Sequence, residues 1–191
     1  YARETMPQLA QQSNLLYYSD YYASGCTTST SVPMIITRAT AEDNALSYQE
    51  RSIIQVFKES GFTTAVVQRG LFAQPSSAYL YQGVDLTRYA RTDAEVIQYV
   101  DKLAEEYDKL FVMFQLRGSH FYYDNFPPEF NTFRPNNIHD KDVVSDSLFI
   151  NAYDNTILYT DHLLSSMIDS LKTLQATAAM WYVSDHGQTI T

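Results

Sequence analysis

The run of hydroxyl residues at positions 27–31, Thr-Thr-Ser-Thr-Ser, is the first part of the chain that could do chemistry. Pro33 and the apolar residues 34–36 follow it, which is the pattern of a helix N-terminus. A hydroxyl at such a terminus lies beside backbone N–H groups that can bind phosphate, and a metal ion bound to it would make it a nucleophile. Taken alone, however, the run is more typical of an ordinary capped helix.

Two further polar clusters contain histidine. Asp185, His186 and Gly187 follow an apolar stretch, and a carboxylate next to an imidazole suits zinc or manganese. His120 follows another apolar stretch and could donate a proton or a hydrogen bond to a transferred group. Each cluster alone fits a structural turn better. Because the carboxyl ends of parallel strands share one edge of a sheet, the clusters could nevertheless meet there.

The elements that must position these residues alternate between strand and helix, which predicts an α/β fold with a mostly parallel sheet and helices on both faces. The patterns predict strands at residues 15–22, 63–67, 110–116 and 179–183, and helices beginning near Pro33 and at 48–60, 93–108 and 143–174, the last one continuous or broken. Residues 70–87 and 121–140 are predicted to be loops.

Other titratable side chains receive no catalytic role. Asp154 and Asp161 have a spacing that is common on the solvated face of a helix. His139 and His162 are predicted to be surface residues.

The composition of the chain limits which ligands and partner molecules it could bind. The chain has 191 residues with 13 Lys and Arg against 22 Asp and Glu, a net charge of −9 that argues against nucleic acid as the main partner. Small phosphorylated substrates remain compatible, because a metal ion can supply local positive charge. Cys26 is the single cysteine, so neither an intramolecular disulfide nor a multi-cysteine metal site can form. No apolar run approaches the roughly 18 residues of a membrane-spanning helix.

Five segments, in this order along the chain, resemble the bacterial phosphoethanolamine transferases of the alkaline phosphatase and sulfatase superfamily. They are YARETMPQL at 1–9, GCTTSTSVP at 25–33, LRGSH at 116–120, NAYDNTILY at 151–159 and YVSDHG at 182–187. In the family the nucleophilic threonine lies three residues before the serine of Ser-Val-Pro, which places it at Thr28. His120 matches the histidine that contacts substrate, and Asp185 and His186 match the metal-binding pair.

The resemblance implies an alkaline phosphatase-like α/β/α sandwich, with residues 1–191 forming a single sulfatase-like catalytic domain. Zinc, with manganese as second choice, would be held by Thr28, Asp185 and His186. Thr28 would attack phosphatidylethanolamine and carry phosphoethanolamine covalently until a lipid A or other glycan hydroxyl accepts it. His120 would stabilise charge on the phosphoryl oxygens. Family members are anchored in the bacterial inner membrane by N-terminal helices, with this domain facing the periplasm.

The resemblance also implies parts that this sequence lacks. The family has a metal-binding Glu upstream of the segment that begins at Tyr1, and a further His downstream of the Asp-His pair. We therefore expect the 191 residues to be a fragment, truncated at both ends, with weak or no zinc binding and little activity by itself. The family often has a disulfide across the nucleophile loop, and the corresponding positions here are Ser24 and Met34. The family commonly has a Glu two residues after the metal-binding His, where this sequence has Gln188.

Other functions remain open. A sulfatase or a phosphodiesterase of the same superfamily is one, although the sulfatase pattern Cys/Ser-x-Pro-x-Arg is absent around Cys26. A phosphoglycerol transferase of the lipoteichoic-acid type, which also uses a threonine, is another. The third is a non-catalytic periplasmic module that binds glycans or a membrane partner.

Overall fold

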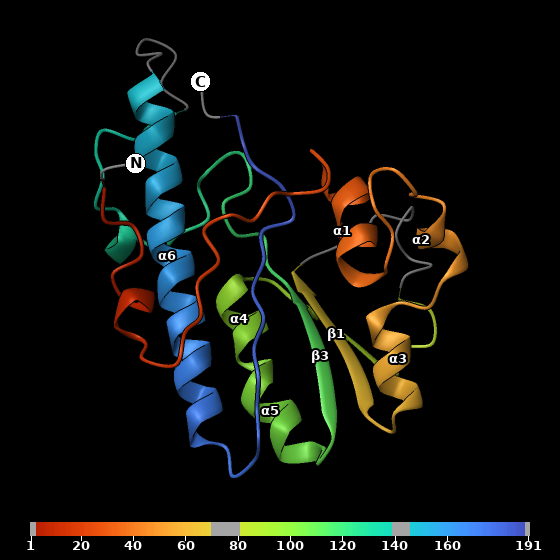
Figure 1. The fold of residues 1–191 in the computed structure, drawn as a ribbon. Coiled ribbons are helices and arrows are strands. Elements are labelled where there is room, and N and C mark those ends of the chain that lie inside the picture. The colour runs from red at the N-terminus through yellow and green to blue at the C-terminus, as the bar shows by residue number, and fades with distance from the viewer. Residues whose placement is uncertain (1–2, 70–80, 139–145, 190–191) are drawn as a thin grey trace. The chain divides into compact units, whose positions relative to one another are not determined.

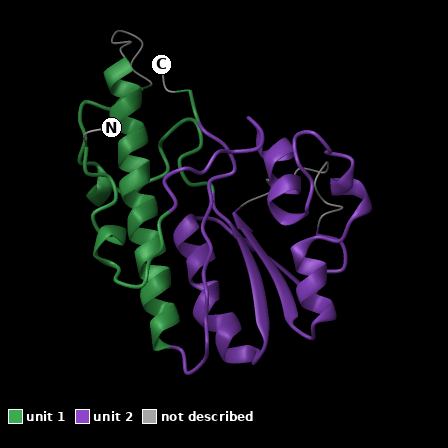
Figure 2. Ribbon diagram, viewed as in Figure 1, with its two compact units in different colours: residues 1–17, 117–173, 188–191 green, residues 18–116, 174–187 purple. Residues whose placement is uncertain are grey.

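The computed structural model describes residues 3–69, 81–138 and 146–189 (Figure 1). The chain divides into two compact units (Figure 2). We call residues 18–116 and 174–187 the sheet unit, and residues 1–17, 117–173 and 188–191 the helical unit.

The sheet unit is built on three parallel strands in the order β2-β1-β3. They are β1 (Thr63–Arg69), β2 (Leu86–Ala90) and β3 (Leu110–Gln115). Five successive residues in the middle of the central strand β1 are buried, as expected for a parallel strand covered on both faces. In the register, Ala65 lies opposite Leu86 on one side and Val112 on the other.

One face of this sheet packs against α4 (Asp93–Ile97) and α5 (Tyr99–Glu106). Ala65 and Val67 of β1 form a buried cluster there with Val96 and Leu103. Because successive side chains of a strand point to opposite faces, the remaining strand residues are available to the other side.

The opposite face packs against α1 (Thr28–Ile36) and α3 (Ile53–Glu59), which lie across the sheet from α4 and α5 in Figure 1. The ring of Phe57 in α3 stacks on Phe111 of β3, with 4.3 Å between the ring centroids. Met113 of β3 packs against Val32 and Ile36 of α1. The predicted α/β fold with helices on both faces of a parallel sheet is confirmed.

Capping residues, and not only the spacing of apolar residues, determine where helices of the sheet unit begin. Ser52 and Gln55 form a reciprocal capping box, so α3 begins at Ile53, and the helix predicted at 48–60 is divided between α3 and the short α2 (Leu46–Gln49). Thr92 accepts a hydrogen bond from the Glu95 amide and caps α4. The helix predicted at 93–108 is two helices, α4 and α5, that meet at Gln98.

Strand β2 corrects the prediction of a loop at 70–87, of which residues 70–80 lie outside the described part. Its start is fixed by Asp85, whose carboxylate accepts hydrogen bonds from Lys58 Nζ at 2.6 Å and from the amide and hydroxyl of Thr64 at 2.9 and 2.8 Å. The contact with Lys58, followed by those with Thr64, lowers the pKa of Asp85 to about 2.

Two predicted strands, 15–22 and 179–183, are not strands in the structure. Both segments have strand-forming aromatic residues, but no described strand pairs with either of them. Their side chains are correspondingly open to solvent, with Tyr22 84% and Trp181 78% exposed. A strand sequence becomes a strand only where a neighbour completes its hydrogen-bond ladder.

The helical unit is organised around one long helix, α6 (Asp146–Thr173), which is the single continuous form of the helix predicted at 143–174. Residues 143–145 and His139 lie outside the described part of the chain. Two short 3-10 helices, η1 (Leu9–Gln11) and η3 (Pro128–Phe130), contact α6. Across the described residues, none of the helices combines the length and apolarity needed to cross a membrane.

Candidate active site

Thr28 is the first residue of α1 and lies where the helix presents its unpaired amides. The preceding residue, Thr27, has extended backbone angles and its side chain does not cap the helix. Among the described residues, the amides of Thr28 and Ser29 therefore have no acceptor. Such amides, together with the positive end of the helix dipole, form a binding position for the oxygens of a phosphoryl group.

Hydroxyl groups pack tightly around this helix start. The Thr27 hydroxyl is 3.1 Å from Ser29 Oγ and 3.0 Å from Thr30 Oγ1, and Thr30 Oγ1 also donates to the Thr27 carbonyl at 2.9 Å. A Cβ atom on Gly25 would lie only 2.4 Å from Thr30 Oγ1. Glycine at position 25 therefore allows the loop to approach the helix this closely.

His186 lies beside Thr28 in the structure. Its Nε2 atom is 3.5 Å from Thr28 Oγ1 and 3.7 Å from Asp185 Oδ2. Its Nδ1 atom is 2.7 Å from the Gly187 carbonyl, which can only accept, so Nδ1 carries the proton. In the neutral ring the Nε2 lone pair is then directed to Thr28 and Asp185, which is the tautomer that a metal ligand needs.

Two oxygen donors therefore lie near His186 Nε2, namely Thr28 Oγ1 and Asp185 Oδ2. Zinc bonds of about 2.0–2.2 Å in a tetrahedron put neighbouring donors roughly 3.3–3.6 Å apart. The distances of 3.5 and 3.7 Å are near this range, so the oxygen and nitrogen donors fit zinc as a partial ligand set. In the part of the chain that the structure describes, no group of three His, Cys, Asp or Glu side chains gathers to complete such a set.

His120 belongs to the helical unit, and its predicted contact with substrate stays a prediction. It lies in a turn after Gly118, which has a φ of 51° that favours glycine. The His120 ring donates from Nδ1 to the Phe121 carbonyl at 2.6 Å. Tyr123 is 2% exposed and packs edge-on against Tyr153 of α6. Its backbone amide donates a hydrogen bond to the His120 carbonyl at 3.0 Å, which anchors the turn.

The structure corrects the interpretation of Asp154 and Asp161 as a solvated helix face. They are 0% and 1% exposed, respectively. Asp161 accepts hydrogen bonds from the amides of Gln8 and Leu9 at 2.9 and 2.8 Å, and Asp154 forms an ion pair with Arg3 at 2.9 Å. His162, predicted to be a surface residue, contacts Gln8 Oε1 at 3.2 Å. These side chains fasten the N-terminal segment to α6.

Asn155 was not singled out from the sequence, yet it is fully buried and fastens a second segment to α6. Its Oδ1 accepts from the amides of Thr132 and Phe133 at 2.9 and 2.8 Å, and its Nδ2 donates to the Phe133 carbonyl at 2.9 Å. Asn151 binds the Pro135 carbonyl in the same way at 2.8 Å. Asparagines one turn apart within the long helical period were the signal for this function.

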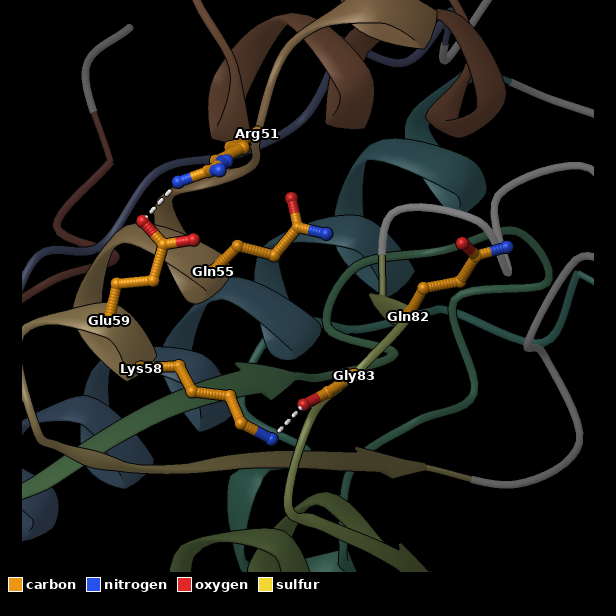
Figure 3. Close-up of a pocket in the computed structure, with 6 residues that line it drawn as sticks. All are labelled: Arg51, Gln55, Lys58, Glu59, Gln82 and Gly83. Atoms are coloured by element: carbon orange, nitrogen blue, oxygen red, sulfur yellow. Dashed lines mark hydrogen bonds and ion pairs between the residues drawn. The ribbon is translucent and has the colours of Figure 1, made fainter.

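A cavity of about 270 Å³ on the sheet unit is a separate feature, drawn in Figure 3. It is lined by Arg51, Gln55, Lys58, Glu59, Gln82 and Gly83. Arg51 is paired with Glu59, and Lys58 bonds to the Gly83 carbonyl and to Asp85. With its cations already neutralised, this cavity is a poor anion site compared with the start of α1.

The parallel sheet covered on both faces defines the chain as an α/β protein. The family profile described as Sulfatase matches residues 1–191, and the chain belongs to the sulfatase family.

The relatives of this chain include phosphoethanolamine transferases. The chain is 28% identical over 212 residues to the Kdo(2)-lipid A phosphoethanolamine 7''-transferase of Escherichia coli (strain K12), covering 100% of this chain and 36% of that protein. It is 26% identical over 216 residues to phosphoethanolamine transferase EptA of Salmonella typhimurium, covering 100% of this chain and 38% of the relative. The chain thus spans little more than a third of the length of these relatives.

Solved structures share the fold. The C-terminal periplasmic domain of EcEptC from Escherichia coli, in complex with Zn, superposes with a TM-score of 0.77 and 23% identity. The match covers 90% of this chain and 54% of that one. The alkaline phosphatase-like fold expected from the sequence is therefore confirmed.

Proposed function

We propose that the protein transfers phosphoethanolamine from phosphatidylethanolamine to a hydroxyl of lipid A or another glycan, through a covalent intermediate on Thr28. The observation that carries this proposal is the 3.5 Å contact between Thr28 Oγ1 and His186 Nε2 at the start of α1. The names of the relatives, which act as phosphoethanolamine transferases, support the choice of the transferred group.

In the first half of the reaction, Thr28 Oγ1 forms a bond to the donor phosphorus and the bond from phosphorus to the diacylglycerol oxygen breaks. The Thr28 proton is delivered to the departing diacylglycerol. The amides of Thr28 and Ser29 bind phosphoryl oxygens, because charge that develops there is stabilised by donors already in place. In the second half, the acceptor oxygen bonds to phosphorus, the bond to Thr28 Oγ1 breaks, and the acceptor proton restores the threonine hydroxyl.

Zinc is the metal that we propose for this site, with Thr28, Asp185 and His186 as the ligands from this chain. When bound, it would lower the pKa of the Thr28 hydroxyl and polarise the phosphoryl group. The EcEptC domain that shares the fold was solved in complex with Zn, which supports this choice over manganese. His120 is proposed to donate a hydrogen bond to the transferred group.

The donor in this proposal is a membrane lipid, as is lipid A among the acceptors, so we place the protein at the bacterial inner membrane with these residues on the periplasmic side. The periplasmic location of the EcEptC domain supports this placement. We take residues 1–191 as part of a single catalytic domain, in agreement with the extent of the family match.

The test is intact-mass spectrometry of the complete protein, supplied with zinc and phosphatidylethanolamine in detergent. Wild type should gain the mass of one phosphoethanolamine, mapped to Thr28, and Thr28→Ala should gain none. Ser29→Ala, which removes the neighbouring exposed hydroxyl, is the matched control and should still be modified. Modification of Thr28→Ala to the same extent as wild type would refute the mechanism.

A further inference from the structure

Ser31 is a buried hydroxyl one turn beyond Thr28 for which the structure provides no partner. Its exposed fraction is 0%, and its Oγ forms no hydrogen bond with any described residue. Leaving a hydroxyl unpaired inside a protein is destabilising, so a group of this kind calls for an explanation.

The reason that Ser31 is left without a partner lies in the carbonyl that would normally satisfy it. A helical serine usually bonds back to the carbonyl four residues earlier, here that of Thr27. That oxygen already accepts from the amides of Thr30 and Ser31 at 3.1 and 3.0 Å, and from Thr30 Oγ1 at 2.9 Å. These three donors already share the two lone pairs of the oxygen, so the Thr27 carbonyl is saturated.

The direction of the Ser31 side chain is also constrained. Its Oγ lies 3.0 Å from the position that a Cβ on Gly25 would occupy, which places it against the loop that leads into Thr28. Side chains of an α-helix tilt toward its N-terminus, and residues three apart share a face, so Ser31 is directed at the turn that carries Thr28. Because it is enclosed, its partner must be a group that is already packed beside it.

We propose that Ser31 is a catalytic residue whose hydroxyl donates a hydrogen bond to Thr28 Oγ1 while the bond from phosphorus to this oxygen breaks. The inference rests on the proposed function and deepens it. A hydroxyl oxygen has two lone pairs, so Thr28 Oγ1, which lies 3.5 Å from His186 Nε2, keeps at least one for a donor even where a metal ion takes the other. Ser31 would reach them by rotation about its Cα–Cβ bond, over the same three-residue spacing at which Thr27 Oγ1 and Thr30 Oγ1 lie 3.0 Å apart.

The hydrogen bond from Ser31 accelerates the second half of the reaction most. As the acceptor oxygen bonds to phosphorus, the electron pair of the old bond returns to Thr28 Oγ1, and the Ser31 donor stabilises that charge. In the first half the same donor also stabilises the attacking oxygen before reaction, so the gain there is smaller.

The test compares Ser31→Ala with wild type in the complete, zinc-supplied protein. The enzyme is loaded from phosphatidylethanolamine labelled in its ethanolamine, the donor is removed, and loss of the label from Thr28 to water is followed by intact-mass spectrometry. We expect discharge of the adduct to slow about 10- to 100-fold, with formation slowed less, so that the adduct accumulates. Ser31→Cys, which keeps a weak donor, should recover part of the discharge rate.

A structural role for Ser31 predicts a different result. Removal of an unpaired buried hydroxyl should leave the midpoint of urea unfolding unchanged or raise it, whereas loss of a structural contact lowers it. Ser19→Ala, which removes an exposed serine hydroxyl elsewhere in the sheet unit, is the matched control and should leave discharge unchanged. Equal discharge rates for Ser31→Ala and wild type, or a slower rate that merely follows lost stability, would overturn the inference. If wild type forms no adduct, the proposed function fails and the inference fails with it.

Discussion

The Oγ1 atom of Thr28 lies 3.5 Å from Nε2 of His186, although 158 positions separate the two residues in the chain. The fold of the sheet unit creates this contact, because α1 packs on the sheet and the segment 174–187 returns to the same unit. The proton on His186 Nδ1 is engaged by the Gly187 carbonyl, so the reactive nitrogen of the ring is directed at the threonine.

Zinc binding should depend on His186. Substitution His186→Ala removes one of the three proposed zinc ligands, so the affinity of the complete protein for zinc should fall by more than the roughly 10- to 100-fold typical of losing an outer-shell partner. Competition with a chelator, read out by atomic absorption, measures this. His162→Ala removes a histidine that contacts Gln8 in the helical unit and should leave zinc affinity unchanged. Equal affinities for wild type and His186→Ala would contradict the assignment.

Strong local patterns were enough to predict part of the fold. Strands β1 and β3 and helix α6 have long apolar runs or a sustained helical period, and the structure contains all three. Strand β2 was missed because its burial alternates and it contains the exposed Thr87 and Tyr89, so nothing local distinguishes it from a loop. Its position is set by the contacts of Asp85 with Thr64 and Lys58, which are tertiary.

The candidate site was predictable only in part for the same reason. Thr28, Asp185 and His186 were predicted from motifs that occur in the family's order along the chain. Their spacing alone could not have shown that Thr28 and His186 are in contact. The burial of Asp161 was missed because its partners are backbone amides of residues 8 and 9, and a backbone amide leaves no mark in the sequence. Helical spacing gives the face of a residue but not what covers that face.

Asp85 should make stability depend on acid. Its pKa of about 2 in the folded protein is below the ordinary value of 3.8, so its contribution is complete above about pH 4 and is lost as the pH falls toward 2. In Asp85→Asn the free energy of unfolding should be lower than in wild type at pH 7, and the difference should shrink between pH 4 and pH 2. Urea unfolding across this range measures it.

The exposed Asp108 provides the control for this prediction, since Asp108→Asn should give a curve parallel to that of wild type. A difference between Asp85→Asn and wild type that stays constant down to pH 2 would show that the carboxylate does not act through its charge.

Asn155 should matter to stability far more than other asparagines. Its replacement by alanine leaves the amides of Thr132 and Phe133 without their acceptor, so Asn155→Ala should lower the free energy of unfolding by about 1–3 kcal/mol. The exposed Asn14 is the comparison, and Asn14→Ala should change stability by no more than about 0.5 kcal/mol. Similar effects of the two substitutions in urea unfolding would show that the Asn155 contacts do not hold the segment.

Gly25 and Thr30 should be energetically coupled. A methyl group at position 25 would meet Thr30 Oγ1 at 2.4 Å, so Gly25→Ala alone should destabilise the protein by about 1–3 kcal/mol and slow modification of Thr28. Thr30→Ala alone loses the hydrogen bonds to Thr27 and should cost about 1 kcal/mol. In the double variant the atom that clashes is gone, so its loss of stability should be smaller than the two single losses added together. A double-mutant cycle by urea unfolding measures the coupling, and strictly additive effects would mean that the loop does not need glycine to approach the helix.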